Sequence, residues 1–267
     1  MKIEQLQPCD FQRITSLLDS EGSHLGEYEI MFMINSGGLF GIKDQKHNLL
    51  GMIGVFNWSD DYAFVGMLIV DAIERRKGLG NELMQFAYNH VGDRVVEVHG
   101  MPWIADLYTK FGLNKTYNIC DFVLNNKIIN SLNSDHWVRK YEAKSISPSL
   151  VNKLTRNCTN YDMMPFFNRR DVDIYYHSNS ANGFACVRPQ GNSIRIGPVF
   201  ADNNEIYFSL LKNIVKESKA RHVISVPMNY QKPYYVGSLD GSKVCMHRGR
   251  PKVLDYSKIY ALTGSEF

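Results

Sequence analysis

The sequence predicts a mixed α/β fold that is built twice in tandem. Residues 62–91 read as an apolar strand, a turn with two glycines and an amphipathic helix, and a second strand follows. Such a β-α-β crossover requires a parallel pair of strands. The other strand-like segments of residues 1–135 are joined by short polar turns, and the same order of elements recurs in residues 136–267. We therefore expect two domains, each with a mixed, mostly antiparallel sheet that has a central parallel pair flanked by helices.

Size and composition agree with this fold class and exclude several functions. A chain of 267 residues suits two domains of about 130 residues each. The net charge of +3 is too small to indicate nucleic-acid binding. Five cysteines lie far apart without a C-x-x-C pair, so we expect mostly buried thiols in a reducing compartment and no metal. No apolar run is long enough for a membrane span, which favours a cytoplasmic protein with no membrane partner.

The first half is expected to begin with a strand, followed by a helix that Asp10 caps and by a second helix that ends at Gly37-Gly38. Two strands and a hairpin turn at Asp60-Asp61 then lead into the glycine segment. A third helix, started by Pro102, follows the strand beyond that segment. The expected strands are residues 2–7, 39–43, 49–58, 62–70, 95–99 and 118–125. The expected helices are one that starts at Phe11, one at residues 27–35, one that follows the glycine turn and ends near Val91, and one at residues 102–112.

The second half repeats this order after a polar stretch at residues 125–135, which is expected to be a linker. A helix starts at Pro148 and another follows the capping-box pattern at residues 202–205. The position of the glycine turn is taken by residues 197–202, which lack both the basic cluster and the glycine pair. We therefore expect one ligand site per chain, in the first half. The expected strands are residues 137–142, 172–177, 184–187, 194–196, 222–226, 244–247 and 259–262, and the aromatic run 161–167 is expected to pack between the halves.

The turn Arg75-x-x-Gly78-x-Gly80 connects a strand to the start of a helix. The first N–H groups of a helix have no internal partners and lie at the positive end of its dipole, and glycines let phosphate oxygens approach them. The basic run Arg75-Arg76-Lys77 then supplies phosphate partners, unless it is only a solvated charged turn. No Gly-Lys-Ser/Thr and no third glycine occur here, so a nucleotide-hydrolysing or nicotinamide enzyme is not indicated.

With its context, this turn resembles a known motif. Residues 70–80 (VDAIERRKGLG) look like the coenzyme-binding motif of the GNAT family of acyl-CoA-dependent N-acetyltransferases, with Ala72 where a proline is common. Residues 107–113 (LYTKFGL) are similar to the second hallmark of that family. The resemblance implies that residues 68–70 bind the pantetheine arm through their backbone and that residues 76–81 hold the pyrophosphate. The coenzyme-binding residues are then Leu68, Ile69, Val70, Arg75, Arg76, Lys77, Gly78, Leu79, Gly80 and Asn81.

The C-terminal half resembles the degenerate second domain of tandem GNAT proteins. The similarity is carried, in the family's order, by residues 196–202 (IGPVFAD), 246–249 (MHRG) and 260–266 (YALTGSE). It implies a second copy of the fold that has lost its coenzyme loop and that shapes the acceptor site.

Acyl transfer to an amine needs a proton acceptor, because a lysine-like amine has a pKa of about 10.4. Glu97 and His99 are two residues apart on a predicted strand, so they share a face, and either is a candidate base, directly or through a water. The alternative is that one of them is only solvated or paired with a neighbouring lysine.

Tyr108 is the candidate general acid. The family resemblance gives this tyrosine the role of protonating the departing thiolate, and a thiolate of pKa near 8.5 can take a proton from a phenol of pKa about 10 at modest cost. The alternative is a core tyrosine with a hydrated hydroxyl group, since Tyr108 lies four residues after Ile104. A backbone N–H near Leu68 or Ile69 is expected to meet the charge on the thioester oxygen.

These observations predict an N-acetyltransferase that moves an acetyl group from acetyl-CoA to a primary amine of a small molecule or peptide by direct attack in a ternary complex. No stretch of the sequence identifies the acceptor, and a homodimer is left open. The main alternative is a non-catalytic acyl-CoA-binding sensor or regulatory scaffold. A purely structural interaction module is a third possibility.

Overall fold

The computed structural model describes residues 2–23, 25–57, 60–132, 138–142, 147–155, 171–177, 183–227, 235–238, 243–249 and 259–261. The chain forms two compact units. The first contains the chain up to Thr116 together with a segment that starts at Val244, and the second contains Tyr117–Lys243 together with residues 259–261. The predicted division lay between residues 135 and 136, so the compact units group the chain differently. The assignment of a catalytic and an acceptor-shaping half stays a prediction.

The sheet of the first unit has the strand order β1-β2-β3-β4-β5-β13. Its strands pair antiparallel except β4 and β5, which are parallel on either side of helix α3. The predicted parallel pair around the glycine helix is thus confirmed. The strands are β1 (Lys2–Gln5), β2 (Leu39–Lys43), β3 (Leu49–Asn57), β4 (Tyr62–Val70), β5 (Val95–Gly100) and β13 (Lys243–Arg248).

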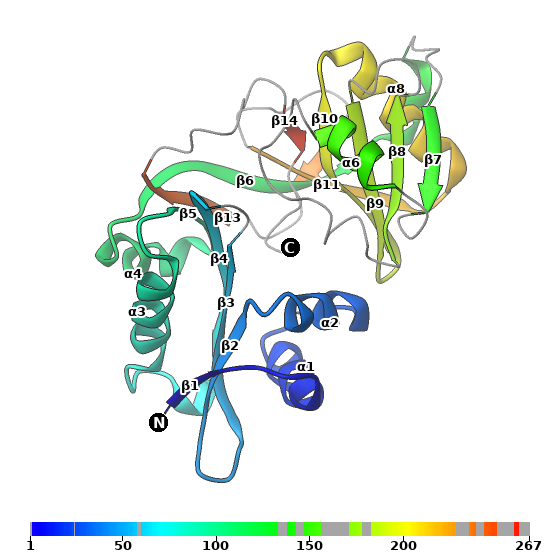
Figure 1. Cartoon of the computed structure of the whole chain (residues 1–267). Coiled ribbons are helices and arrows are strands. Elements are labelled where there is room, and N and C mark those ends of the chain that lie inside the picture. Colours follow the sequence, from blue (N-terminus) through cyan, green and yellow to red (C-terminus); the bar gives the residue numbers. More distant parts are fainter. Residues whose placement is uncertain are drawn as a thin grey trace. The chain divides into compact units, whose positions relative to one another are not determined.

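Helices cover both faces of this sheet, with α1 and α2 on one side and α3 and α4 on the other (Figure 1). Each face has its own apolar core, because residues that alternate along a strand point to opposite faces. Phe64 belongs to the core under α1 and α2, whereas Val96 and Val98 pack under α3 and α4. The helices are α1 (Phe11–Ser20), α2 (Glu27–Asn35), α3 (Leu79–Val91) and α4 (Ala105–Lys110), with the 3-10 turns η1 (Pro8–Asp10), η2 (Ala72–Glu74) and η3 (Pro102–Ile104).

The second unit repeats the crossover: β10 and β11 pair in parallel on either side of helix α8. Its strand order is β6-β11-β10-β9-β8-β7, and β12 pairs with β6 while β14 pairs with β10. The strands are β6 (Asn114–Leu124), β7 (Val138–Glu142), β8 (Asp173–His177), β9 (Gly183–Gln190), β10 (Ser193–Ala201), β11 (Arg221–Pro227), β12 (Tyr235–Ser238) and β14 (Ile259–Ala261), and the helices are α5 (Asn126–Ser131), α6 (Pro148–Thr155) and α8 (Asn204–Glu217).

Two strands are exchanged relative to the predicted halves. Most of the predicted strand at 118–125 lies in β6, which pairs with β11 of the second unit, and the chain passes from one unit to the other within β6. The predicted strand at 244–247 lies in β13, which pairs with β5 of the first unit. The sequence did not indicate either exchange, because the pattern within a strand does not reveal its partner.

The predicted linker at residues 125–135 is wrong over part of its length, since residues 126–131 form helix α5. Asn125 caps this helix by accepting hydrogen bonds from the N–H groups of Lys127 and Ile128 at 3.1 and 3.3 Å. Ile129 is fully buried in the core of the second unit. The polar residues that suggested a linker thus form the N-terminal cap of helix α5 and the exposed face of this helix.

Some predictions fall wholly or partly outside the described residues, which do not include Trp58 at the end of the third predicted strand, the aromatic run 161–167, or residues 133–137 and 262–267. Within the described ranges, no helix is both long and apolar enough to cross a membrane.

Replacing Asn125 with alanine should lower the free energy of unfolding by about 1 kcal/mol, because two backbone N–H groups at the start of α5 lose their acceptor. Urea unfolding followed by circular dichroism measures this change. Lys127→Ala, an exposed substitution in the same helix, is the control and should have almost no effect. Equal stabilities of Asn125→Ala and Lys127→Ala would show that the cap does not stabilise the unit.

Candidate functional site

The parallel pairing of β4 and β5 stops part of the way along both strands. Tyr62–Val65 pair with Val95–Val98, but β4 continues to Val70 and β5 to Gly100. Residues 66–70 of β4 have β3 on one side and, within the described structure, no strand partner on the β5 side. Backbone groups that lack a strand partner are available to an extended ligand.

A bulge in β4 begins where this pairing ends. Met67 has a positive φ of 52°, and the β3–β4 register shifts between Met52 and Gly54, so that β4 has one extra residue there. A bulge bends its strand and increases the local twist, which turns β4 away from β5. The strained Met67 backbone thus marks the start of the open edge that contains Leu68, Ile69 and Val70.

The glycine turn follows this edge directly. Gly78 has a φ of 90° and is the N-cap residue of α3, and a Cβ at this position would meet no atom within 4 Å. The first helical hydrogen bond runs from the N–H of Glu82 to the carbonyl of Gly78 at 3.0 Å. The N–H groups of Leu79, Gly80 and Asn81 therefore precede the helical ladder. The side chain of Leu79 is buried in the core, so this residue can serve a ligand only through its backbone.

The three basic residues before Gly78 have different surroundings. Arg75 forms an ion pair with Glu21 and donates from Nε to the carbonyl of Val70 at 3.1 Å. Lys77 pairs with Glu74 at 3.0 Å. Arg76 is exposed, has a positive φ of 63°, and has no ion pair with any described residue. Of the three, Arg76 has the charge most available to an anionic ligand.

Tyr108 on α4 lies against the end of β5. A Cβ on Gly100 would come within 2.2 Å of Cε2 of Tyr108, so the ring occupies the space above this glycine. Gly100 is two residues beyond the last residue of β5 that pairs with β4, so Tyr108 packs on β5 beyond the end of the parallel pairing. Burial raises the pKa of the phenol well above its ordinary value. The hydroxyl therefore stays protonated and can donate a hydrogen bond.

Glu97 and His99 lie on the other face of β5, on the side of α1 and α2, as their alternation predicts. The ring of Phe64 from that core meets the ring of His99 edge-on at 5.2 Å between centroids. In the antiparallel pairing with β13, Glu97 lies opposite His247 and His99 lies opposite Cys245. All four of these paired side chains are buried.

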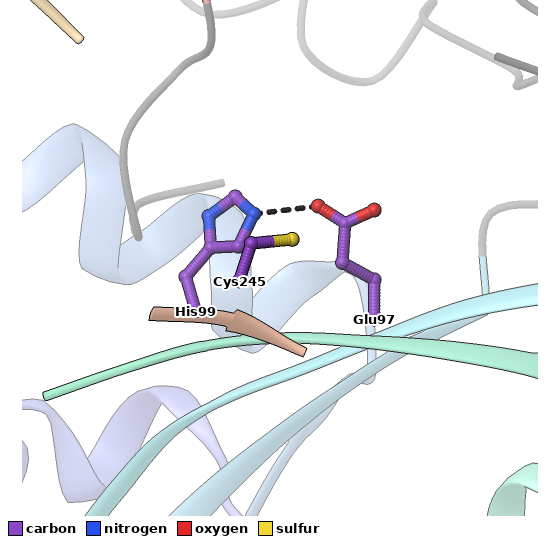
Figure 2. Close-up of side chains that lie close together, drawn as sticks. All are labelled: Glu97, His99 and Cys245. Atoms are coloured by element: carbon purple, nitrogen blue, oxygen red, sulfur yellow. Dashed lines mark hydrogen bonds and ion pairs between the residues drawn. The ribbon is translucent and has the colours of Figure 1, made fainter. Parts of the chain in front are cut away.

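These side chains form one hydrogen-bonded network around Glu97. Nε2 of His99 lies 2.5 Å from Oε1 of Glu97, and Nε2 of His247 lies 2.9 Å from Oε2. The hydroxyl of Tyr62 donates to the same Oε2. Thr116 at the start of β6 reaches Nδ1 of His247 at 2.8 Å. Figure 2 shows His99, Glu97 and the Sγ of Cys245 pointing toward one another.

The pKa of Glu97 follows from two opposed effects. Burial alone would raise it, but the hydrogen bonds from His247 and His99, together with their charges, hold it far below its ordinary value. Glu97 is therefore an ionised carboxylate at neutral pH. A carboxylate with so low a pKa is a poor proton acceptor, which weighs against its direct use as a base.

Sequence reasoning missed four members of this network: Tyr62, Thr116, Cys245 and His247. The pattern E-x-H at 97–99 and the pattern C-x-H at 245–247 each place two reactive side chains on one face of a strand. Only the pairing of β5 with β13, across about 150 residues of chain, brings the two patterns together.

Comparison with known proteins identifies the fold and the family. Residues 3–113 match the description "Acetyltransferase (GNAT) family", and residues 151–259 match "Acetyltransferase (GNAT) domain". A curated relative, the holothin acyltransferase of a Pseudoalteromonas strain, is 25% identical over 191 residues, which are 68% of this chain and 62% of that protein. The match thus spans less than two thirds of the length of that relative.

Two solved structures have similar folds at low sequence identity. A candidate acetyltransferase from Pyrococcus horikoshii has a TM-score of 0.81 at 16% identity, covering 99% of this chain and 95% of its own. A tandem GNAT protein from the clavulanic acid biosynthesis pathway has a TM-score of 0.60 at 11% identity, covering 94% of this chain and 99% of its own. With both of its halves matched, the chain belongs to the GNAT family and carries two GNAT domains in tandem.

Proposed function

We propose that this protein transfers an acetyl group from acetyl-CoA to a primary amine of a small molecule or peptide, by direct attack in a ternary complex. One observation carries the proposal: the open edge of β4 leads directly into the glycine turn at the start of α3. Such an edge suits the amide-containing pantetheine arm, and a helix start suits the pyrophosphate that is attached to it.

In this proposal the coenzyme binds mainly to backbone. The peptide groups of Leu68, Ile69 and Val70 pair with the pantetheine amides, and the carbonyl of Val70 takes part only if Nε of Arg75 releases it. The N–H groups at Gly78–Asn81 bind the pyrophosphate, and the exposed side chain of Arg76 adds a positive charge. Arg75 and Lys77, already paired with Glu21 and Glu74, bind phosphate only if those ion pairs open.

The proposed reaction has four steps. The acceptor ammonium gives a proton to a base on the protein, for which Glu97 and His99 are the candidates. The neutral nitrogen attacks the thioester carbon, and a backbone N–H near Leu68 or Ile69 meets the charge on its oxygen. The C–S bond then breaks with its electron pair leaving on the sulfur, and the second proton of the amine nitrogen is released to solvent, from which the departing thiolate is finally protonated. Tyr108 donates to the departing sulfur; since burial raises its pKa, a strong hydrogen bond suits this group better than early proton transfer.

The alternative of a non-catalytic acyl-CoA sensor makes a different prediction. A sensor needs the coenzyme loop but neither Tyr108 nor buried acid-base groups. The curated relative is named an acyltransferase, which supports the enzyme. A thiol-release assay with acetyl-CoA against pooled amines, amino acids, polyamines and peptides distinguishes the two. Coenzyme binding by calorimetry without thiol release for any pool would favour the sensor.

Replacing Gly78 with aspartate should weaken acetyl-CoA binding by tenfold or more, about 1.4 kcal/mol, because a carboxylate would stand where the pyrophosphate binds. Gly78→Ala is the matched control: it has the same unfavourable backbone conformation at a φ of 90° and finds open space for its Cβ, but adds no charge. Isothermal titration calorimetry measures both. Similar losses in the two variants would show that backbone strain, and not phosphate binding, explains the effect.

Replacing Tyr108 with phenylalanine should lower kcat by about tenfold to a hundredfold and leave the Kd for acetyl-CoA nearly unchanged, because only the hydroxyl that faces the leaving sulfur is lost. Steady-state kinetics with an acceptor from the amine pools measures this change. Tyr88→Phe, on α3, is the control. An unchanged kcat for Tyr108→Phe across all active acceptors would remove Tyr108 from the mechanism.

A further inference from the structure

We propose that Nδ1 of His99 is the atom that takes the proton from the acceptor amine, and that Glu97 and His247 are positioning residues for this imidazole. The inference rests on the proposed acetyl transfer and deepens it by separating two candidate bases. It also gives a role to His247, which lies on a strand about 150 residues farther along the chain.

The carboxylate of Glu97 has little capacity left for another proton donor. Oε2 accepts from the hydroxyl of Tyr62 and from Nε2 of His247, and Oε1 lies against Nε2 of His99. The whole side chain is only 4% exposed. A carboxylate with three charge-assisted or buried donors is stabilised in its ionised form.

The ionised state of Glu97 decides where the histidine protons lie. A carboxylate without a proton can only accept, so Nε2 of His99 and Nε2 of His247 must both carry hydrogen. Whenever one of these imidazoles is neutral, its other nitrogen, Nδ1, is the one with an open lone pair. The two histidines therefore have the same tautomer, and they differ in what Nδ1 meets.

Nδ1 of His247 already has a partner, since the hydroxyl of Thr116 lies 2.8 Å away. Sγ of Cys245 lies 3.8 Å from the same nitrogen. Nδ1 of His99 is buried and has no hydrogen-bond partner among the described residues. A buried acceptor without a partner is costly unless a ligand supplies the donor. His99 is thus the one of the two whose Nδ1 has no partner among the described residues, and the proposal gives this atom the acceptor ammonium as its donor.

The groups around His99 suit the positive charge that its imidazole has after taking a proton. When Nδ1 takes a proton, His99 becomes an imidazolium whose Nε2–H still points at the ionised Glu97, 2.5 Å away. The other titratable groups that face this pair are Tyr62 on β4, and Cys245 and His247 on β13. The edge-on ring of Phe64 limits rotation of the imidazole. Glu97 therefore orients His99 and stabilises its charged form, as a carboxylate does for the histidine of a catalytic triad.

A metal site is the competing explanation of the same cluster. Ligand atoms of Glu97, His99 and Cys245 lie within 4.8 Å of one another, and all three residue types bind zinc. With zinc bonds of about 2.0–2.2 Å, however, tetrahedral nitrogen and oxygen ligands lie about 3.3 Å apart. The observed 2.5 Å between His99 and Glu97 is a hydrogen-bond contact and leaves no room for an ion between these two atoms.

The test compares His99→Gln with His247→Gln, because each substitution removes one imidazole donor from the same carboxylate. We expect His99→Gln to lower kcat by about a hundredfold or more. His247→Gln should lower it by less than about tenfold and change the pH dependence of kcat/KM, with the KM for acetyl-CoA unchanged in both. Thermal unfolding checks that both variants fold. Equal losses in the two variants would overturn the proposal and favour Glu97 as the base.

A second measurement needs no acceptor and so remains decisive if acetyl transfer itself is not found. Nitrogen-15 NMR of the histidine rings in the unmodified protein should show His99 with hydrogen on Nε2 and an unprotonated Nδ1. Hydrogen on Nδ1 of neutral His99 would overturn the assignment.

Metal analysis of the purified protein distinguishes the proton-acceptor role of His99 from a zinc site. Under the proposal, neither the unmodified protein nor Cys245→Ser contains stoichiometric zinc. The matched control is Cys120→Ser, another buried free cysteine. One zinc per chain that is lost with Cys245→Ser but kept with Cys120→Ser would make the cluster a metal site and refute the proton-acceptor role.

Discussion

The early end of the β4–β5 pairing is the constraint on which the rest of the first unit depends. Two parallel strands that stayed paired would satisfy each other's backbone groups and leave nothing for a ligand. The bulge at Met67 ends the ladder after Val65, and the same strand then runs into the glycine turn. An open edge and a helix start thus follow one another along a single stretch of chain, which matches the order of amide and phosphate groups in an acyl-CoA.

The same opening brings together two faces of the sheet that otherwise have separate cores. Tyr108 belongs to the core under α3 and α4, and His99 contacts the core under α1 and α2. In a continuous sheet, the backbone layer would keep an acid on one face from a base on the other. The proposed reaction therefore requires the acyl group to lie where the pairing of β4 and β5 has ended. The proposed division of roles between Tyr108 and His99 follows from their positions on opposite faces of the sheet.

The local elements of this site could be predicted from the sequence, but its long-range pairings could not. The bounds of β4 and α2 and the shared face of Glu97 and His99 follow from periodicity and turn residues. The partnership of Glu97 with His247 depends on which strand lies beside β5, and nothing within residues 243–248 encodes that choice locally. The difference between the two histidines is equally non-local, because Thr116 contacts Nδ1 of His247, whereas Nδ1 of His99 has no partner among the described residues.

The placement of β13 has a consequence for how such a chain can evolve. The first unit takes its last strand from residues 243–248, and the second unit contains most of β6, which precedes the rest of its chain. Neither half of the gene therefore encodes a complete sheet, although the order of elements suggests a simple duplication. A recombination event that joined the first half to a foreign partner would lose His247 and the strand that carries it. The sheet of the first unit is thus complete only in a chain that also contains residues 243–248.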